Sequence, residues 1–144
     1  MRKKIYIKYH DNGLERCKKI KVGDWVDLRA AENVALSQFE YAEISLGISI
    51  RLPKGFEAHI LPRSSTYKKW GIIESNSMGV IDNSYSGDQD IWKFPAIALR
   101  DTAIEKNDRI CQFRIMKKQP KLRFIERLFL SGKNRGGFGE GTGR

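Results

Sequence analysis

The chain has 144 residues, of which 40% are hydrophobic and 31% are charged, and its formal net charge at pH 7 is +10. This composition is too apolar for wholesale disorder, and the length suits one globular domain with its own core. The chain lacks the run of about 18 apolar residues that a membrane helix requires, and the start "MRKKIYIKYH" alternates where a secretion signal would turn apolar, so we expect a cytoplasmic protein with no membrane partner.

Short runs that alternate apolar and polar residues, or that are rich in β-branched residues, predict strands along most of the chain. In chain order they cover residues 4–9, 41–52, 56–61, 71–75, 79–82, 90–99, 109–116 and 122–128. Turn residues separate them, as in "LPKGF" and "EKND". No helical pattern of adequate length has start and stop signals. The fold class is therefore predicted to be all-β, a sandwich or barrel of short antiparallel strands.

The last 14 residues, "SGKNRGGFGEGTGR", contain six glycines. Such a segment cannot hold a strand by itself. We therefore expect a β domain of residues 1–130 and a mobile arm of residues 131–144.

The cysteines and histidines do not predict a metal site. Cys17 and Cys111 lack a C-x-x-C or Cys/His spacing, and His10 and His59 have no carboxylate or cysteine cluster near them in the sequence. We expect reduced thiols, and a metal ion only if it arrives with a ligand.

The positive charge raises the question of nucleic acid, because Lys and Arg neutralise phosphates. The basic residues are spread through "RKK", "RCKKIK", "YKK", "MKKQPKLR" and the tail, without interleaved aromatic residues or a basic helical stripe. A small polyanion such as a nucleoside triphosphate explains the charge equally well. The pattern argues against nucleic acid without excluding it.

Two segments in the first half of the chain carry polar groups beside apolar runs. Asp27 lies in "VDLRA", where an acid is also an ordinary partner for Arg29. "LPRSS" (61–65) offers a guanidinium and two hydroxyls, which donate to phosphate oxygens but also occur in plain turns.

The segment "GVIDNSYSGD" is more specific. Asp82 lies between two aliphatic residues and Tyr85, so its carboxylate could act as a general base beside an aromatic wall. The alternative is a hairpin in which Asn83 and Ser84 only make the turn.

Two further segments lie near the C-terminus. In "DRICQF", Gln112 has a side-chain amide that could donate to a phosphate, or simply face solvent. In the tail, glycine N–H groups could surround an anion and Phe138 could stack on a base, or the end could be disordered.

Together, and in this order, the five segments resemble the five ordered motifs of the trimeric dUTP pyrophosphatases (dUTPases) over nearly the whole chain. The segment "GDQDIWKFPAIALRD" resembles the dUTPases of phages of Gram-positive bacteria. The resemblance implies a jelly-roll β-barrel homotrimer with three sites, each built from all three subunits. It also implies Mg²⁺-dependent hydrolysis of dUTP to dUMP and pyrophosphate by water attack at the α-phosphorus, which limits uracil incorporation into DNA and supplies dUMP for dTMP synthesis.

The resemblance assigns roles to residues around the third motif. Asp82 matches the general base, and Tyr85 matches the tyrosine that stacks under deoxyribose and rejects a 2′-hydroxyl. Asn76 matches a residue that reads uracil, within an expected hairpin that also contains the substrate-binding residues Gly79 and Ile81.

Other matched residues would contact the phosphates. Ser64 and Gln112 lie at matching positions, with Arg63 beside them, and Ser65, also expected to bind substrate, stands where the family usually has glycine. Asp27 matches an acid that holds waters on a Mg²⁺ ion chelated by the triphosphate.

The tail resembles an arm that closes over the substrate. Phe138 would cover uracil, Lys133 or Arg135 would contact the γ-phosphate, and Gly139 and Thr142 would also bind substrate. Here the sequence departs from the family pattern, because Lys133 aligns with the usual arginine and Arg135 lies two residues after it.

Three alternatives remain. "RSS" also resembles the dCTP deaminases, which share the fold but have a differently built third motif. A phage-type dUTPase could act chiefly on a regulatory protein partner. The basic surface could serve nucleic acid.

Overall fold

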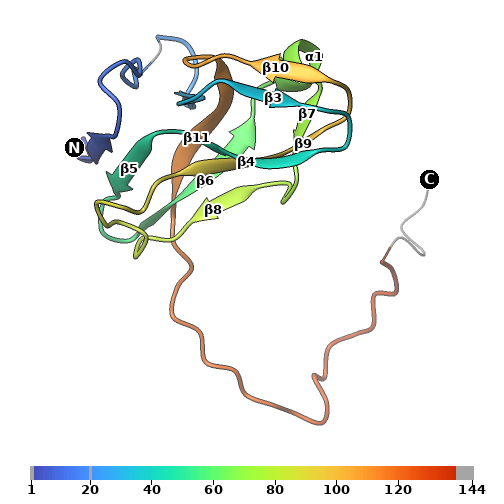
Figure 1. Cartoon of the computed structure of the whole chain (residues 1–144). Helices are drawn as coiled ribbons and strands as arrows, with labels where there is room; N and C mark the ends of the chain where they lie inside the picture. The colour runs from blue at the N-terminus through green and yellow to red at the C-terminus, as the bar shows by residue number, and fades with distance from the viewer. Residues whose placement is uncertain (1, 20, 139–144) are drawn as a thin grey trace.

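The structure is a computed structural model of the single chain, and it describes residues 2–19 and 21–138. Its described part consists of eleven strands and one short helix (Figure 1). In chain order these are β1 (Tyr6–Tyr9), β2 (Val26–Arg29), β3 (Val34–Leu36), β4 (Tyr41–Ser45), β5 (Ile48–Arg51), β6 (Phe56–Pro62), α1 (Thr66–Trp70), β7 (Ile72–Glu74), β8 (Gly79–Ile81), β9 (Lys93–Ala98), β10 (Thr102–Ile104) and β11 (Arg109–Lys117). The predicted all-β class is confirmed.

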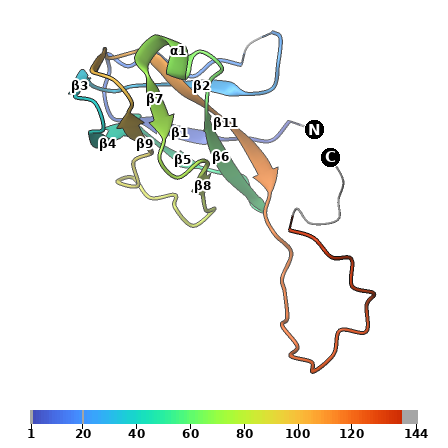
Figure 2. The same ribbon diagram turned by 90° about the vertical axis from the view of Figure 1, so that its right-hand side faces the viewer.

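All the strand pairs are antiparallel. They form one four-stranded sheet in the order β2-β11-β6-β8, one three-stranded sheet in the order β4-β9-β7, and the pairs β1-β5 and β3-β10. Figure 2, turned by 90°, separates β4 and β9 from β6 and β11. Apolar side chains of both sheets fill the space between them, and Trp92 packs edge-on against Phe113 with ring centroids 5.3 Å apart.

The predicted strand 41–52 is two strands, because the chain turns at Gly47. Gly47 has a φ of 64°, and a Cβ there would come within 2.7 Å of the Ala31 Cβ. Glycine is therefore required on both conformational and steric grounds. The turn moves the chain from the three-stranded sheet to a separate pairing with β1.

The sequence did not predict β2, β3, β10 or α1. The helix is only five residues long and ends at Gly71, whose φ of 62° is typical of a left-handed C-cap. So short an element carries no helical period that a sequence could display. No helix in the described part of the chain is long and apolar enough to cross a membrane.

The predicted strand at 122–128 is wrong for the single chain. The last strand ends at Lys117, and the described residues that follow form neither strand nor helix; Figure 1 shows them leaving the body as an extended coil. The alternation marked apolar residues correctly, but a strand also needs a partner for its backbone groups. Large apolar side chains therefore stay exposed on this coil at Leu122, Phe124, Ile125, Leu128, Phe129 and Leu130.

Both cysteines are free thiols, as the sequence predicted. Burial raises the pKa of both Cys17 and Cys111. Neither is therefore activated as a thiolate nucleophile.

Candidate active site

A cleft of about 560 Å³ lies beside β8, against residues of β4 and β9. Its lining residues are Glu43, Ile60, Asn76, Gly79, Val80, Ile81, Asp82, Ser84, Tyr85, Ile91, Trp92, Lys93 and Pro95. The predicted residues of the third motif are all among them. The expected hairpin over residues 76–85 is wrong, however, because β8 pairs with β6 while β7 pairs with β9.

Asp82 is exposed directly after β8, and Ser84 orients its carboxylate. Oδ1 accepts the Ser84 hydroxyl at 2.6 Å and the Ser84 amide at 2.8 Å. These two bonds, the hydroxyl bond first, lower the pKa of Asp82 below its ordinary value of 3.8. Asp82 is therefore ionised at neutral pH, and no described residue donates a hydrogen bond to its Oδ2.

The loop after β8 is anchored by two residues that follow Asp82, Asn83 and Tyr85. Asn83 Nδ2 donates to the carbonyls of Pro53 and Phe56 at 2.9 and 2.8 Å. The Tyr85 hydroxyl donates to the Ile91 carbonyl at 3.1 Å. The aromatic ring of Tyr85 is thus fixed beside the cleft while 40% of the residue remains exposed.

Strand β8 brings the backbone close to the interior. Gly79 is buried, and a Cβ there would lie 3.2 Å from the Ile60 Cβ, so a side chain would disturb the packing beneath the cleft. Ile81 is half-buried on the same strand, and Asn76 is exposed in the turn that precedes it. The segment therefore offers one polar side chain and an approachable backbone to a ligand.

Asp27 lies in a second group of polar side chains, on β2. Its Oδ1 is 2.9 Å from Arg63 Nε and its Oδ2 is 3.2 Å from Arg109 Nη1. Gln112, opposite Asp27 on β11, donates from Nε2 to the Pro62 carbonyl at 3.0 Å. Two cations, one carboxylate and one amide thus meet at one end of the four-stranded sheet.

Thr66 fixes the turn that carries the two predicted serines. Its buried Oγ1 accepts the Arg63 amide at 2.8 Å and donates to the Ile110 carbonyl at 2.8 Å. Ser64 is exposed in this turn, and Ser65 is half-buried at the N-cap of α1. The sequence-predicted residues Arg63, Ser64, Ser65, Gln112 and Asp27 therefore do lie together.

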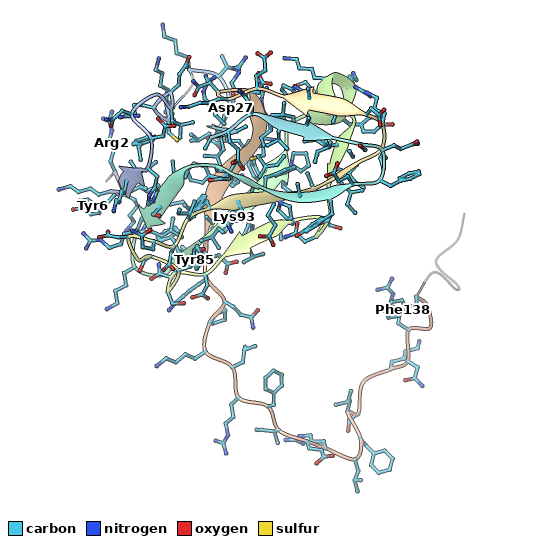
Figure 3. The ribbon with its side chains drawn as sticks, viewed as in Figure 1. Arg2, Tyr6, Asp27, Tyr85, Lys93 and Phe138 are labelled. Carbon is cyan, nitrogen blue, oxygen red and sulfur yellow. The ribbon has the colours of Figure 1, made fainter. Side chains whose placement is uncertain are left out.

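The two groups are far apart in a single chain. Strand register puts Asp27 level with Leu61, whereas Asp82 follows the residue that pairs with Ala58. The offset is about four residues along the strands and three strand spacings across the sheet, or about 20 Å. Figure 3 likewise shows Asp27 and Tyr85 on opposite sides of the body.

The predicted tail residues that the structure describes do not contact either group. Lys133, Arg135 and Phe138 are exposed on the coil after β11, and Figure 3 shows Phe138 well away from the body. Gly139 and Thr142 lie outside the described residues.

Comparison with known proteins gives the family. The dUTPase family model matches residues 25–142. The chain is 58% identical over 135 residues to the SPbeta prophage-derived deoxyuridine 5′-triphosphate nucleotidohydrolase YosS of Bacillus subtilis (strain 168), with 94% of this chain and 95% of the relative covered. The chain belongs to the dUTPase family. The prophage origin of this relative also confirms the predicted phage type.

Solved dUTPases share the fold of this dUTPase-family chain. A mutant of the phage 80alpha dUTPase matches with a TM-score of 0.79 at 20% identity, over 96% of this chain and 99% of that one. A mutant dUTPase from phage phi11 of S. aureus, described with a structural Mg(II) ion, matches with a TM-score of 0.73 at 17% identity, over 87% and 98%. The predicted dUTPase-like jelly roll is confirmed.

Some cleft residues of this dUTPase-family chain escaped the sequence analysis. Lys93 of β9 and Glu43 of β4 face the cleft and form an ion pair at 3.6 Å. The buried Trp92 lies next to them. Their proximity depends on the pairing of β4 with β9, which no local pattern in the sequence encodes.

Glu74 is a buried carboxylic acid behind the cleft. It is 6% exposed, and neither carboxyl oxygen has a hydrogen-bond partner among the described residues. Burial raises its pKa to about 7, against a smaller opposing effect of the Gly79 amide. The sequence does carry one signal that Glu74 is buried. Glu74 lies two residues after the buried Ile72, so alternation along the strand puts it on the inward face of β7.

Proposed function

We propose that the protein hydrolyses dUTP to dUMP and pyrophosphate in a Mg²⁺-dependent reaction. The observation that carries the proposal is an ionised, oriented carboxylate, Asp82, at the cleft of a chain that belongs to the dUTPase family. The activity would limit uracil incorporation into DNA and supply dUMP for dTMP synthesis. We place it in the cytoplasm, with the nucleotide pool.

Asp82 acts as the general base. A water attacks the α-phosphorus, its proton passes to the Asp82 carboxylate, and the bond from the α-phosphorus to the bridging oxygen breaks to release pyrophosphate. The two bonds from Ser84 hold Oδ1, which leaves Oδ2 to accept the proton. A low pKa keeps the base deprotonated at neutral pH.

The nucleoside binds along β8. Asn76 offers the amide that reads uracil, and the approach permitted by Gly79 lets backbone groups next to Ile81 contact the base. The Tyr85 ring lies under deoxyribose, where a 2′-hydroxyl would collide with it. Its hydrogen bond to the Ile91 carbonyl supports this role, because a ring held in place excludes a 2′-hydroxyl better than a mobile ring does.

The triphosphate binds the group around Asp27. Arg63, Ser64, Ser65 and Gln112 provide donors for phosphate oxygens. Each oxygen of Asp27 is paired with one arginine, and a carboxylate has about four acceptor positions, so acceptors remain for waters on Mg²⁺. When bound, the ion offsets phosphate charge and orients the phosphates for in-line attack.

A homotrimer would bring the two groups together. One dUTP cannot reach from Asp82 to Asp27 across about 20 Å of a single sheet and still satisfy both roles. The exposed apolar side chains on the coil after β11 also support association, because such a run is unusual on a monomer. We therefore propose that each site takes its base and its phosphate-binding group from different copies.

The tail completes the site. We propose that residues 131–144 form an arm that closes over bound substrate, with Phe138 on uracil, Lys133 or Arg135 on the γ-phosphate, and Gly139 and Thr142 also in contact. The exposure of the described members of this set supports the proposal, since they are free to move.

The test is an incubation with Mg²⁺ and each of dUTP, dCTP, dTTP and UTP, followed by detection of pyrophosphate and the nucleoside products. We expect dUMP and pyrophosphate from dUTP alone. Asp82→Asn should abolish the reaction, whereas Asp88→Asn, which removes an exposed charge from the same loop, should not. Deamination of dCTP would favour the alternative that the protein is a dCTP deaminase. A folded protein that is inert on all four nucleotides would refute the proposal.

A further inference from the structure

The excess positive charge lies entirely outside the central part of the chain. Residues 26–116 contain 11 Lys and Arg against 12 Asp and Glu, whereas residues 1–25 contain eight against three and residues 117–144 contain eight against two. The N-terminal segment, with the two-stranded pair β1-β5, is folded onto the body. It therefore forms a basic surface of defined shape.

Alternation along β1 sorts its side chains into two faces. On β1, Tyr6 and Lys8 are exposed, whereas Ile7 on the opposite face packs on the core. Arg2 and Lys4, in the irregular segment that precedes the strand, are exposed as well. Figure 3 shows Arg2 and Tyr6 on the same side of the body, away from Asp27 and Tyr85. An aromatic ring and one cation thus lie on the outer face of β1, with two more exposed cations in the segment that leads into it.

Strand β5 extends this surface sideways. Arg51 lies opposite Tyr6, with its guanidinium carbon 4.5 Å from the centre of the Tyr6 ring, and Ser49 lies opposite Lys8. These residues and the loop around Asp88 line a hollow of about 200 Å³. An exposed ring, two cations and a hydroxyl therefore border one depression.

The cations of this surface are little neutralised. Arg2, Lys4 and Arg51 form no ion pair with any described residue, and Lys8 is 3.9 Å from the exposed carboxylate of Asp88. A contact of that length on the surface contributes little, so it competes weakly with an external anion.

We propose that the outer face of β1 and β5 binds single-stranded nucleic acid. Here this surface is named the β1 face, and it consists of Tyr6, Lys8 and Arg51 on the two strands together with Arg2 and Lys4 in the segment before β1. One base stacks on the Tyr6 ring, and the cations neutralise the neighbouring phosphates. In a duplex the bases are paired and stacked on one another, so none of them could stack on Tyr6. An exposed ring combined with unpaired cations on a sheet is typical of single-strand recognition.

The sequence argued against nucleic acid because its basic residues looked dispersed. Pairing of β1 with β5 changes this interpretation, since it brings Arg51 beside Tyr6 from 45 residues away. The fold thus adds a cation from a distant segment to an aromatic residue that already lies within the basic N-terminal run.

The β1 face is separate from the nucleotide cleft. Ser84 and Tyr85 line the cleft, whereas Ser86, Gly87 and Asp88 line the hollow, so the loop after β8 stands between the two. The two surfaces therefore share no lining residue.

The test measures fluorescence anisotropy of a labelled oligothymidine of about 20 nucleotides with the full-length protein, over about 50 to 200 mM salt. Lys4→Gln with Lys8→Gln should lower the slope of log affinity against log salt by about 1.4, at about 0.7 per phosphate contact. Lys68→Gln with Lys69→Gln, which removes the same charge from exposed positions of α1, is the matched control and should leave the slope unchanged.

A second variant tests stacking without altering charge. Tyr6→Ala should weaken binding roughly 5- to 150-fold and Tyr6→Phe should not. Hydrolysis of dUTP should be unchanged in all these variants, and excess dUMP should not displace the oligonucleotide. An oligouridine of equal length distinguishes RNA from DNA as the preferred strand.

Three results would overturn the proposal. They are an absence of binding at the lowest salt, equal losses in the two double-lysine variants, and equal affinity of Tyr6→Ala and the unaltered protein. The last two would indicate attraction by net charge alone.

Discussion

The Ser84 hydroxyl donates to Asp82 Oδ1 over 2.6 Å, and the Ser84 amide donates to the same oxygen. Both bonds favour the ionised carboxylate and lower the pKa of Asp82. One residue thus sets both the orientation and the ionisation of the proposed base.

Removal of the Ser84 hydroxyl should therefore move the acidic limb of the pH–rate profile. Ser84→Ala loses the larger of the two effects, so the pKa of Asp82 rises and kcat/KM begins to fall at a higher pH. We expect a shift of the limb by up to about one pH unit, with a loss of a few-fold at neutral pH. Ser86→Ala is the control, and an unmoved limb in Ser84→Ala would contradict this role.

The raised pKa of Glu74 should make the folded protein less stable as the pH rises. Its pKa is raised from 4.5 to about 7 in the folded chain. Between these values the folded chain holds a proton that the unfolded chain has released, so the free energy of unfolding falls as pH rises and levels off above about 7. The full effect is on the order of 3 kcal/mol.

Glu74→Gln removes this titration, so its Tm relative to the unaltered protein should increase from pH 4.5 to pH 8, by several degrees in total. Protein concentration is held constant, because assembly also contributes to Tm. Glu105→Gln, an exposed carboxyl lost elsewhere, is the comparison. A Tm difference for Glu74→Gln that is the same at every pH would be inconsistent with a buried protonated acid.

Local patterns identified those elements that have one face on the core. Burial alternates along β1 and along β11 from Cys111 to Arg114, and both strands were predicted. The strand at 122–128 was wrong because alternation reveals an apolar face but cannot supply a neighbouring strand. The helix α1 was missed because its boundaries depend on Gly71 and on the buried Thr66, not on a repeat.

The motif residues of the candidate site were predictable from the sequence, but their arrangement in space was not. The motif residues followed from their order along the chain, which resembles a known family. The distance between Asp27 and Asp82 follows instead from the register of four strands, and the pairing of Lys93 with Glu43 from two others. Long-range pairing of this kind is not encoded in any short segment.

Substitution of Asp27 should change the Mg²⁺ dependence of hydrolysis more than it changes folding. Asp27→Asn removes the charge that two arginines share, so waters on the ion lose an acceptor and Arg63 loses its partner. We expect kcat/KM to fall roughly 100-fold, with a higher Mg²⁺ concentration needed for half-maximal rate. A Mg²⁺ titration of the variant, beside Asp88→Asn, measures both effects; an unchanged half-maximal concentration would speak against contact through water.

Truncation after Leu130 should reduce turnover without unfolding the body. The described residues beyond this point are almost all exposed and lie outside the core. We expect kcat to fall at least about 10-fold while Tm changes by less than about 2 °C. A parallel fall in Tm would indicate that the arm stabilises the fold instead of closing the site.

Mixing two inactive variants tests whether each site combines different copies. Asp82→Asn lacks the base and Asp27→Asn lacks the phosphate-side acid, so each alone should retain at most about 1% of the unaltered activity. If a site takes these groups from two copies, random assembly of equal amounts leaves both groups intact in about a quarter of the sites. Co-refolding of the two variants should therefore restore about a quarter of the unaltered rate per site, whereas sites contained within one chain would stay inactive in every mixture. The about 20 Å between the two groups in a single sheet makes restoration the expected result.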